Sequence, residues 1–477
     1  MENKRLNCLK KRILMWILKK RAERYYKKKE YDKAITELSK ALVIAPNDAD
    51  LYERRGHIYR IKAEFPDTDS EGAAEIRKTQ NMLALEDYSV AIELNPDNAA
   101  VYKKRGWIYD DLEDDQKALA DYNQAIAIDP ELGGHVYYLR GALYSKQDKL
   151  QAAIDDFDKA ISLIDKNSQS VYRFGDAATF YWDRGEAYEK KGNLNNAFAD
   201  FREAAKQPGN CIYCWLLGEK YKERGEYQQA VDAYSEGIKK NPTWDAPYSD
   251  RAEAYAELED YETSFADYSK ALELDNSDGW TYCSRAKLYE KLGNNEAALA
   301  DYAKAIELDN SSYGMYYYRA EFYEKLGNNE AALADYTKSI ELDTSNNMAY
   351  FKRAAVYEKM GDTNAALDDY QTIIADCSND IERDSSDYSR YYHRAKAYKK
   401  LENNKSALAD CTRVIQILTE GNTKDYMWML PEMYYYRGLA YKALDDETRA
   451  KADFETAVKL DPKEVKYREA LGGKDGV

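Results

Sequence analysis

Apolar residues along this chain recur in helical stripes that alternate with short polar breaks. In residues 313–346, the first stripe runs from Tyr316 to Tyr323, with aromatic or small side chains at positions i, i+4 and i+7 of one helix face. Gly327 and two asparagines interrupt this stripe, and glycine readily takes the left-handed conformation that ends a helix. A second stripe covers residues 332–342. The pattern therefore predicts a helix, a tight turn and a second helix, neither of which can bury its stripe alone.

The same helix-turn-helix pattern repeats through most of the chain. Residues 289–302 and 323–336 are the same fourteen amino acids, YEKLGNNEAALADY, displaced by 34 positions. A constant period of this length is typical of a stacked helical repeat. We place twelve repeats, which start at residues 15, 49, 99, 134, 178, 211, 245, 279, 313, 347, 388 and 431.

These repeats resemble the tetratricopeptide repeat (TPR) family in the spacing of their small and aromatic residues. The family pattern W-x2-[LG]…Y…A-x3-F…P is matched with Tyr for Trp, Arg for Leu and often Tyr for Phe. The resemblance covers roughly 450 of the 477 residues and implies an all-α, right-handed superhelical solenoid of about twelve helix-turn-helix units. The style of the repeats is similar to that of bacterial multi-TPR proteins of unassigned role. One repeat carries the pattern as Tyr102, Gly106, Tyr109, Ala118, Tyr122, Ala125 and Pro130.

The placement of the repeats divides the chain into three segments. Residues 1–14 are a basic amphipathic N-terminal segment, residues 15–463 are the solenoid, and residues 464–477 are a short capping helix and a frayed tail. Four repeats carry extra residues. Such loops can bear function, although a tolerated surface loop is the simpler interpretation. The extra residues are expected between the two helices at 65–79, and after the second helix near 165–177, 377–387 and 418–430.

A comparison of the repeats with one another predicts an ion pair within the scaffold. In eleven repeats, from Arg21 to Arg437, an Arg stands three residues after the first packing position. The same eleven have an acidic residue just before the aromatic position of the second helix, and the twelfth has Leu217 and Ala233 instead. Because the two residues are present or absent together, we expect each Arg to contact a carboxylate between helices, within a repeat or in its neighbour.

A row of large aromatic residues directly follows the first packing position. In the TPR family the first helices line the inner, concave surface, and this row is rotated about 100° from the packing stripe. Exposed aromatic side chains in a groove are typical hot spots for peptide binding. The alternative is that these rings fill gaps between successive first helices. The candidate peptide-binding row is Tyr138, Trp182, Trp215, Tyr317, Phe351, Tyr392 and Tyr435.

Charge is distributed unevenly along the chain. The net charge is −16, and residues 1–30 carry +9, which leaves −25 on the rest. An acidic body argues against nucleic acid as a partner and favours basic or apolar protein segments.

The basic N-terminal segment has two interpretations. Its apolar residues share one helix face, and Lys and Arg fill the other. The helix could lie on an anionic membrane or on an acidic partner. The alternative is that the apolar stripe simply covers the first repeat, because Trp16 and Leu18 already belong to that repeat. The stripe consists of Leu6, Leu9, Ile13, Trp16 and Ile17.

The sequence contains no motif that predicts an enzyme. It has no phosphate-cradling glycine loop, nucleophile motif or metal-spaced ligand cluster, and its three His residues fall in distant repeats. Cys211 and Cys214 form a C-x-x-C motif without a second pair, and six Cys do not make a disulfide framework in a chain of this size. We therefore predict no cofactor, no metal and no catalytic activity.

Two functions remain as hypotheses. The first is a cytoplasmic, non-enzymatic scaffold that binds extended or helical segments of other proteins in the concave groove. The alternative is a membrane-surface assembly factor tethered through residues 1–30, peripheral at the inner membrane face. No apolar run approaches the roughly 18 residues of a membrane-spanning helix, so this tether would lie on the bilayer.

Overall fold

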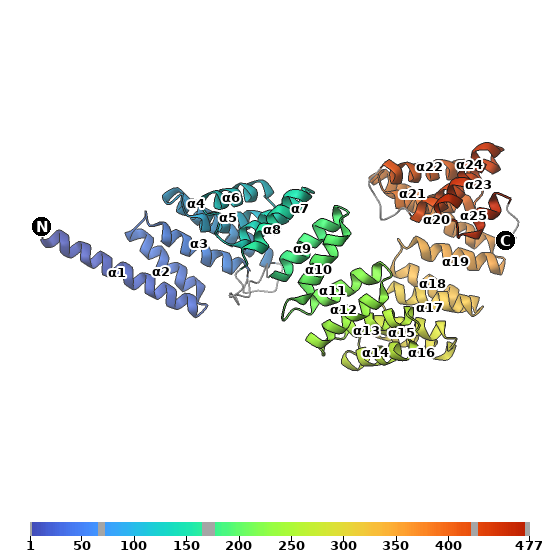
Figure 1. The fold of residues 1–477 in the computed structure, drawn as a ribbon, viewed down its shortest axis with the longest axis horizontal. Helices are drawn as coiled ribbons and strands as arrows, with labels where there is room; N and C mark the ends of the chain where they lie inside the picture. Colours follow the sequence, from blue (N-terminus) through green and yellow to red (C-terminus); the bar gives the residue numbers. More distant parts are fainter. Residues whose placement is uncertain (1, 65–71, 165–176, 421–427, 473–477) are drawn as a thin grey trace. The chain divides into compact units, whose positions relative to one another are not determined.

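The computed structural model describes residues 2–64, 72–164, 177–420 and 428–472, with side chains from residue 10 onward. These residues form 25 α-helices, which alternate between the first and the second helix of twelve repeats and end in one short helix (Figure 1). The first helices and the short last helix are α1 (Glu2–Lys27), α3 (Ala49–Glu64), α5 (Ala99–Asp111), α7 (Gly134–Lys146), α9 (Ala177–Lys190), α11 (Ile212–Glu223), α13 (Ala246–Glu257), α15 (Gly279–Lys291), α17 (Tyr313–Lys325), α19 (Asn347–Met360), α21 (Tyr388–Lys400), α23 (Leu430–Ala443) and α25 (Val465–Ala470). The second helices are α2 (Tyr31–Ile44), α4 (Gly72–Leu94), α6 (Asp115–Ile128), α8 (Leu150–Ser162), α10 (Leu194–Lys206), α12 (Tyr227–Lys240), α14 (Tyr261–Leu274), α16 (Asn295–Leu308), α18 (Asn329–Leu342), α20 (Thr363–Arg383), α22 (Asn404–Glu420) and α24 (Glu447–Leu460).

The turn between the two helices of a repeat is fixed by a left-handed residue and a helix cap. Gly327 has a φ of +74°, and the backbone N–H of Asn328 donates to the carbonyl of Tyr323 at 2.9 Å. The side chain of Asn328 then accepts the N–H of Ala331 at 3.2 Å, which caps α18. In this copy, glycine removes the steric cost of the left-handed conformation. The predicted helix-turn-helix unit is thus confirmed.

In ten of the twelve repeats, an aromatic ring of the second helix packs on a small residue of the first, and Leu38 and Cys411 take the place of this ring in the other two. Tyr122 of α6 is fully buried, and a Cβ added to Gly106 of α5 would lie 2.8 Å from its ring. Tyr336 of α18 is buried in the same way against Ala320 of α17. Within each unit, these rings and the alanines around them form a series of small cores, as expected for a helical array.

The predicted Arg–carboxylate pair is confirmed, and it lies within a repeat. Nε of Arg319 donates to one oxygen of Asp335 at 2.7 Å, and Nη2 donates to the other at 2.9 Å. Ten repeats have this two-point contact, whereas Arg21 and Glu37 of the first repeat lie 3.8 Å apart. The helix pair α11–α12 has buried Leu217 and Ala233 in the same place. The ten pairs are Arg55–Asp87, Arg105–Asp121, Arg140–Asp156, Arg184–Asp200, Arg251–Asp267, Arg285–Asp301, Arg319–Asp335, Arg353–Asp369, Arg394–Asp410 and Arg437–Asp453.

The extra residues of the longer repeats differ from the expected loops. Residues 377–383 are not a loop, because α20 continues through them to Arg383, and Cys377 is buried at the start of the added turns. Residues 72–79 belong to α4. The rest of the predicted insertions at 65–71, 165–176 and 421–427 lie outside the described residues. At the N-terminus, α1 is one helix from Glu2 to Lys27, so the segment 1–14 is continuous with the first repeat.

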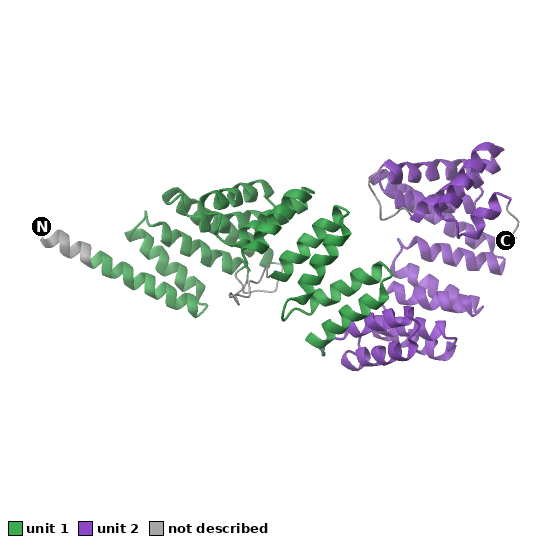
Figure 2. Cartoon of the chain, in the orientation of Figure 1, with its two compact units in different colours: residues 1–242 green, residues 243–477 purple. Residues whose placement is uncertain are grey.

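The chain separates into two compact parts, unit 1 (residues 1–242) and unit 2 (residues 243–477) (Figure 2). The sequence pattern alone did not predict this division, because the period of the repeats continues through residue 242. Unit 1 contains α1 to α12, and unit 2 contains α13 to α25. The two units differ strongly in charge, because residues 243–477 carry −15 of the net −16.

Candidate protein-binding surface

The first helices of neighbouring repeats touch one another directly. Such contacts join α7 with α9, α13 with α15, α15 with α17, α17 with α19, and α21 with α23. Among the described residues, no two second helices of neighbouring repeats contact each other to this extent. The first helices therefore lie closer together than the second helices within each stack, and we call the surface they form the inner face.

Two members of the predicted aromatic row are buried. Trp182 is 6% exposed, with its ring 4.5 Å from that of Phe201 and 5.4 Å from that of Tyr213. Tyr392 is 5% exposed and donates its hydroxyl hydrogen bond to Glu432 of the next repeat. These two rings fill the space between repeats, as the alternative interpretation of the row expects.

The other five members of the row, Trp215 among them, are half-buried. Four of them pack on the second-helix ring of their own repeat, with ring centres about 6 Å apart, so packing accounts for much of their surface. A binding role for the row as a whole stays a prediction. The pairs are Tyr138–Phe157 (5.9 Å), Tyr317–Tyr336 (5.7 Å), Phe351–Tyr370 (5.9 Å) and Tyr435–Phe454 (6.0 Å).

In unit 2, a chain of polar contacts links successive repeats along the inner face. Tyr336 donates its hydroxyl hydrogen bond to Glu324 at 3.2 Å, and Lys359 of the next repeat pairs with the same carboxylate. The same contact is made by Tyr302, Glu290 and Lys325, and again by Tyr370, Glu358 and Lys400. We call each set a Tyr–Glu–Lys triad. The triads satisfy the buried hydroxyl and tie the first helices of neighbouring repeats together.

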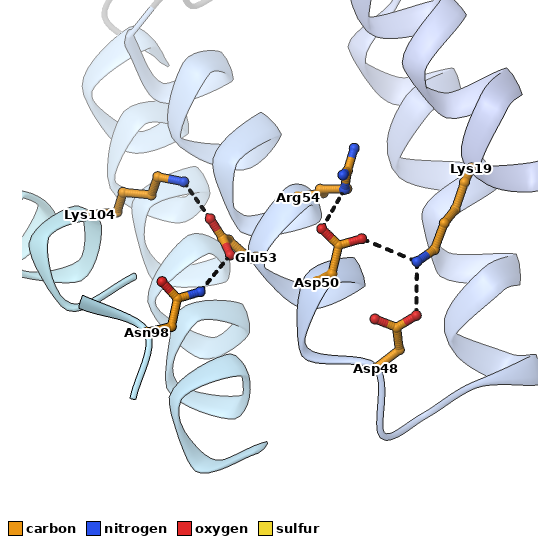
Figure 3. Close-up of polar contacts among 7 residues, drawn as sticks. All are labelled: Lys19, Asp48, Asp50, Glu53, Arg54, Asn98 and Lys104. Carbon is orange, nitrogen blue, oxygen red and sulfur yellow. Dashed lines mark hydrogen bonds and ion pairs between the residues drawn. The ribbon is translucent and has the colours of Figure 1, made fainter. Parts of the chain in front are cut away.

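In unit 1, the inner face has a different set of polar contacts (Figure 3). Lys19 of α1 reaches Asp48 at 2.9 Å and Asp50 at 3.2 Å, so it ties the first repeat to the start of the second. On α3, Glu53 accepts hydrogen bonds from Asn98 at 3.0 Å and from Lys104 of α5 at 2.6 Å. These charges are paired between helices, so they stabilise the stack and leave little free charge for a ligand.

Among the described first helices of unit 2, the most exposed aromatic ring is that of Trp280, which was not among the predicted site residues. Trp280 is 50% exposed and stands at the start of α15. Its ring lies against Gly314 of α17, where an added Cβ would come within 2.8 Å of it. The ring of Tyr318 meets it edge-on at 6.2 Å, and Nζ of Lys287 lies 3.5 Å above the centre of that second ring. Trp280 therefore spans two first helices and keeps half of its surface open.

The sequence does contain a signal for Trp280, but it needs two repeats to be read together. Trp280 is the second residue of its first helix, and the same position in the next repeat is Gly314. A large residue followed 34 positions later by glycine leaves room for the ring on the neighbouring helix. The predicted aromatic row takes a single position in each repeat, and Trp280 and Gly314 stand at a different position.

Burial changes the ionisation of several side chains on the first helices. Burial is the main cause that raises the pKa of Asp183 to about 6, although Tyr138 donates a hydrogen bond to it at 2.8 Å, which opposes the shift. Burial also lowers the pKa values of His57 and His393 to about 4, so both rings are neutral at pH 7. Each of these His residues stands in a separate repeat.

Two features of the described residues concern a metal site and a reactive thiol. Across residues 10–64, 72–164, 177–420 and 428–472, no group of three or more His, Cys, Asp or Glu side chains could hold a metal ion. Within the C-x-x-C motif, Cys214 is buried, its thiol donates to the carbonyl of Ala205 at 3.3 Å, and burial raises its pKa. A raised thiol pKa disfavours the reactive thiolate. Within the same described part of the chain, no helix is long and apolar enough to cross a bilayer.

Family models match this chain over most of its repeats. A model described as "TPR repeat" and three described as "Tetratricopeptide repeat" account for these matches. The chain therefore belongs to the tetratricopeptide repeat family, whose members are generally non-enzymatic scaffolds for protein–protein interaction. The first model matches residues 22–60, 252–293 and 323–361, and the others match 99–132, 134–167, 178–210, 281–312, 348–380 and 431–464.

The chain is similar to several solved structures, each with a TM-score below 0.5. Yeast Tom70 is 16% identical over 96% of this chain and 94% of its own, with a TM-score of 0.46. The Cut9–Hcn1 hetero-tetramer of the APC/C matches at 14% identity over 96% and 95%, with a TM-score of 0.39. A tetratricopeptide repeat protein from Parabacteroides merdae matches at 20% identity over 62% and 98%, with a TM-score of 0.37. No curated protein matches this chain in sequence.

Proposed function

We propose that this chain is a non-enzymatic scaffold that binds a segment of another protein on the inner face of unit 2, around Trp280. The observation that supports this proposal is the half-exposed Trp280 ring, which spans α15 and α17 and lies beside Tyr318. Most large apolar side chains of the first helices are covered by a neighbouring repeat. An aromatic ring that is held rigidly and left half open is a typical anchor for a protein partner.

The surroundings of Trp280 specify the chemistry of the partner. The ring offers a flat apolar surface. About one turn further along α15, Ser284 donates a 2.7 Å hydrogen bond to Glu253 of the preceding first helix, α13. Unit 2 carries −15, so basic residues beside the anchor are favoured over acidic ones. We therefore expect an extended or helical segment with one aromatic or large aliphatic side chain that packs on Trp280 and with Lys or Arg nearby.

Selection from a phage-displayed library of random peptides on the immobilised full-length chain tests this proposal. We expect the selected peptides to share an apolar anchor with basic neighbours, and Trp280→Ala to weaken their binding by about tenfold or more, as hot-spot rings do. Gly314→Ala, which pushes a methyl group into the ring, should weaken the same peptides.

Trp16→Ala is the matched control, because it removes an even more exposed Trp from α1. It should leave the affinity of every selected peptide unchanged. Peptides that bind Trp280→Ala and the unaltered chain equally well would place the binding surface elsewhere and refute the role of Trp280.

The second candidate function adds a membrane tether to the same scaffold. One observation favours a membrane tether over the alternative in which the apolar stripe of α1 only covers the first repeat. Trp16 is 63% exposed and Ile13 is 51% exposed, so these apolar residues do not cover the repeat that follows. Leu6 and Leu9, which belong to the same predicted stripe, lie outside the residues whose side chains are described.

A further inference from the structure

The outward face of α1 is a strip that combines apolar and basic side chains. Leu18 and Ala22 are buried and point toward α2, where they join the core of the first repeat. Ile13, Trp16 and Lys20 lie on the opposite side of α1, because they are rotated by roughly half a turn from these buried positions. The strip continues with Arg24 and Lys27 along the same side. We call Ile13, Trp16, Lys20, Arg24 and Lys27 the outward strip.

The strip is dominated by positive charge. Lys20, Arg24, Lys27 and Lys28 line a surface hollow together with a single acid, Glu23. That carboxylate is already shared by Lys20 and Lys27, each at 3.2 Å. Lys10 and Lys11, about one and a half helical turns before Trp16, are exposed as well. The strip therefore keeps a net positive charge on a chain whose residues 31–477 carry −25.

We propose that the outward strip docks on the surface of an anionic lipid bilayer with α1 parallel to the membrane plane; the inference rests on the proposed tether function. From Ile13 to Lys27 the strip is about 21 Å long. Trp and Ile side chains insert at the level of the lipid headgroups, and Lys and Arg bind the anionic headgroups around them. Each basic residue near such a surface adds attraction that salt screens.

Charge and composition favour a bilayer over other occupants. A nucleic acid would be repelled by the acidic body of the chain. A protein groove would bury Trp16 and Ile13 but would also have to desolvate the lysines between and beyond them, which is costly without matched acids. A membrane interface accepts both, because lysine stems can lie along the apolar layer while the ammonium groups stay in water.

Co-sedimentation of the full-length chain with vesicles tests the proposal. The probes are vesicles of phosphatidylcholine alone and of phosphatidylcholine with one-third phosphatidylglycerol. We expect the chain to pellet with the anionic vesicles only, and to be released as the ionic strength is raised. Lys20→Glu/Arg24→Glu/Lys27→Glu should reduce the bound fraction at least tenfold, and Ile13→Ala/Trp16→Ala should reduce it severalfold.

Two control variants separate the strip from general charge and general exposure. Lys270→Glu/Lys304→Glu/Lys338→Glu makes the same change in net charge on the exposed surfaces of α14, α16 and α18. It should bind as the unaltered chain does, as should Trp280→Ala. Circular dichroism confirms that each variant keeps its helices.

Each other outcome refutes either the tether function or the role of the outward strip. If the unaltered chain binds neither kind of vesicle, the tether function itself fails. If it binds both kinds equally, or if the triple variant of the outward strip still binds, the tether stands and the outward strip is refuted. Self-association that the strip variant abolishes, without vesicle binding, would show that a second copy of the chain occupies the strip.

Discussion

Unit 1 and unit 2 are built from the same helix pair, yet their inner faces differ. In unit 2, three successive Tyr–Glu–Lys triads join the repeats, and the buried hydroxyls of Tyr302, Tyr336 and Tyr370 each donate to a carboxylate. In unit 1, only the last helix pair has such a contact among the described residues, from Tyr234 to Glu219. In unit 1, Tyr122 occupies the same position as Tyr336, and its buried hydroxyl has no hydrogen-bond partner among the described residues. The residue that corresponds to Glu324 is Asp110, which is one methylene shorter.

This comparison separates what the repeat needs from what each unit uses. The Arg–Asp contact inside the repeat is kept in both units, from Arg55–Asp87 to Arg437–Asp453, so it belongs to the scaffold. The inner face varies, with a buried Trp182 in unit 1 and a half-exposed Trp280 in unit 2. Positions that differ among the repeats are therefore better candidates for a functional role than positions that are the same in most repeats.

The largest expected effect on stability comes from replacing Trp182, which is the buried one of these two tryptophans. Trp182→Ala should destabilise unit 1 by about 3–5 kcal/mol, because the ring is packed between Phe201 and Tyr213 and its removal leaves a cavity. Trp280→Ala should change the stability of unit 2 by about 0.5 kcal/mol or less, since its ring is half open. Urea unfolding followed by circular dichroism measures both. Equal losses for the two variants would contradict the assignment of one ring to packing and the other to binding.

A second prediction compares the ion pair of unit 2 with the helix pair of unit 1 that lacks it. Arg319→Leu leaves the nearly buried Asp335 without its two hydrogen bonds and should cost about 2–4 kcal/mol. Arg319→Leu/Asp335→Ala reproduces the Leu217 and Ala233 combination of α11–α12, and should be more stable than the single variant. The same urea titrations decide this. If the double variant is no more stable than the single one, the two residues do not act as a pair.

A third prediction uses the titration of Asp183, which lies on a first helix of unit 1. Its pKa is about 6 in the folded chain and is ordinarily about 3.8, so the folded state holds the proton more tightly. The stability that the protonated form provides is complete below about pH 4 and is lost as the pH rises through 6. Asp183→Asn cannot ionise and can still accept the Tyr138 hydrogen bond. Its stability advantage over the unaltered chain should therefore grow between pH 4 and 6, to at most about 3 kcal/mol.

Two features of this titration serve as internal controls. His57 and His393 have pKa values lowered to about 4. The unaltered chain and Asp183→Asn therefore lose the same stability from these two rings as the pH falls from 6.5 toward 4. The difference between their free energies of unfolding then reports on Asp183 alone. Tyr138→Phe removes the hydrogen bond that lowers the pKa of Asp183, so the loss of stability that accompanies ionisation of Asp183 should move to higher pH. Parallel stability curves for the unaltered chain and Asp183→Asn would show that this carboxylate is not perturbed.

The sequence predicted the fold far better than the binding surface, and the reason is physical. The period of 34, the Gly327 turn and the coupled Arg319 and Asp335 are local or pairwise signals that recur in many copies. Exposure depends on the neighbour: Trp182 and Tyr392 occupy an inner-face position, but the next repeat covers them. The extension of α20 to Arg383 was missed because added helical turns and an added loop lengthen a repeat by the same number of residues.

The smallest expected effect tests the triad itself. Asp110→Glu in unit 1 lengthens the side chain that faces Tyr122, and should allow the hydroxyl to donate to it as Tyr336 does to Glu324. Lys146, which stands where Lys359 stands in unit 2, would complete the triad. Satisfying one buried hydroxyl should stabilise unit 1 by about 1 kcal/mol.

Substitutions that weaken a triad in unit 2 serve as controls for the substitution that should create one in unit 1. Glu324→Asp shortens the acceptor and should cost about 1 kcal/mol. Tyr336→Phe should cost a similar amount, because it leaves Glu324 without a donor, whereas Tyr122→Phe removes a hydroxyl that has no partner and should be neutral or stabilising. Urea midpoints of the four variants measure these differences. If Tyr122→Phe and Tyr336→Phe lose equal stability, the hydroxyl of Tyr122 is satisfied in solution, and the contrast between the two inner faces lies in their charges alone.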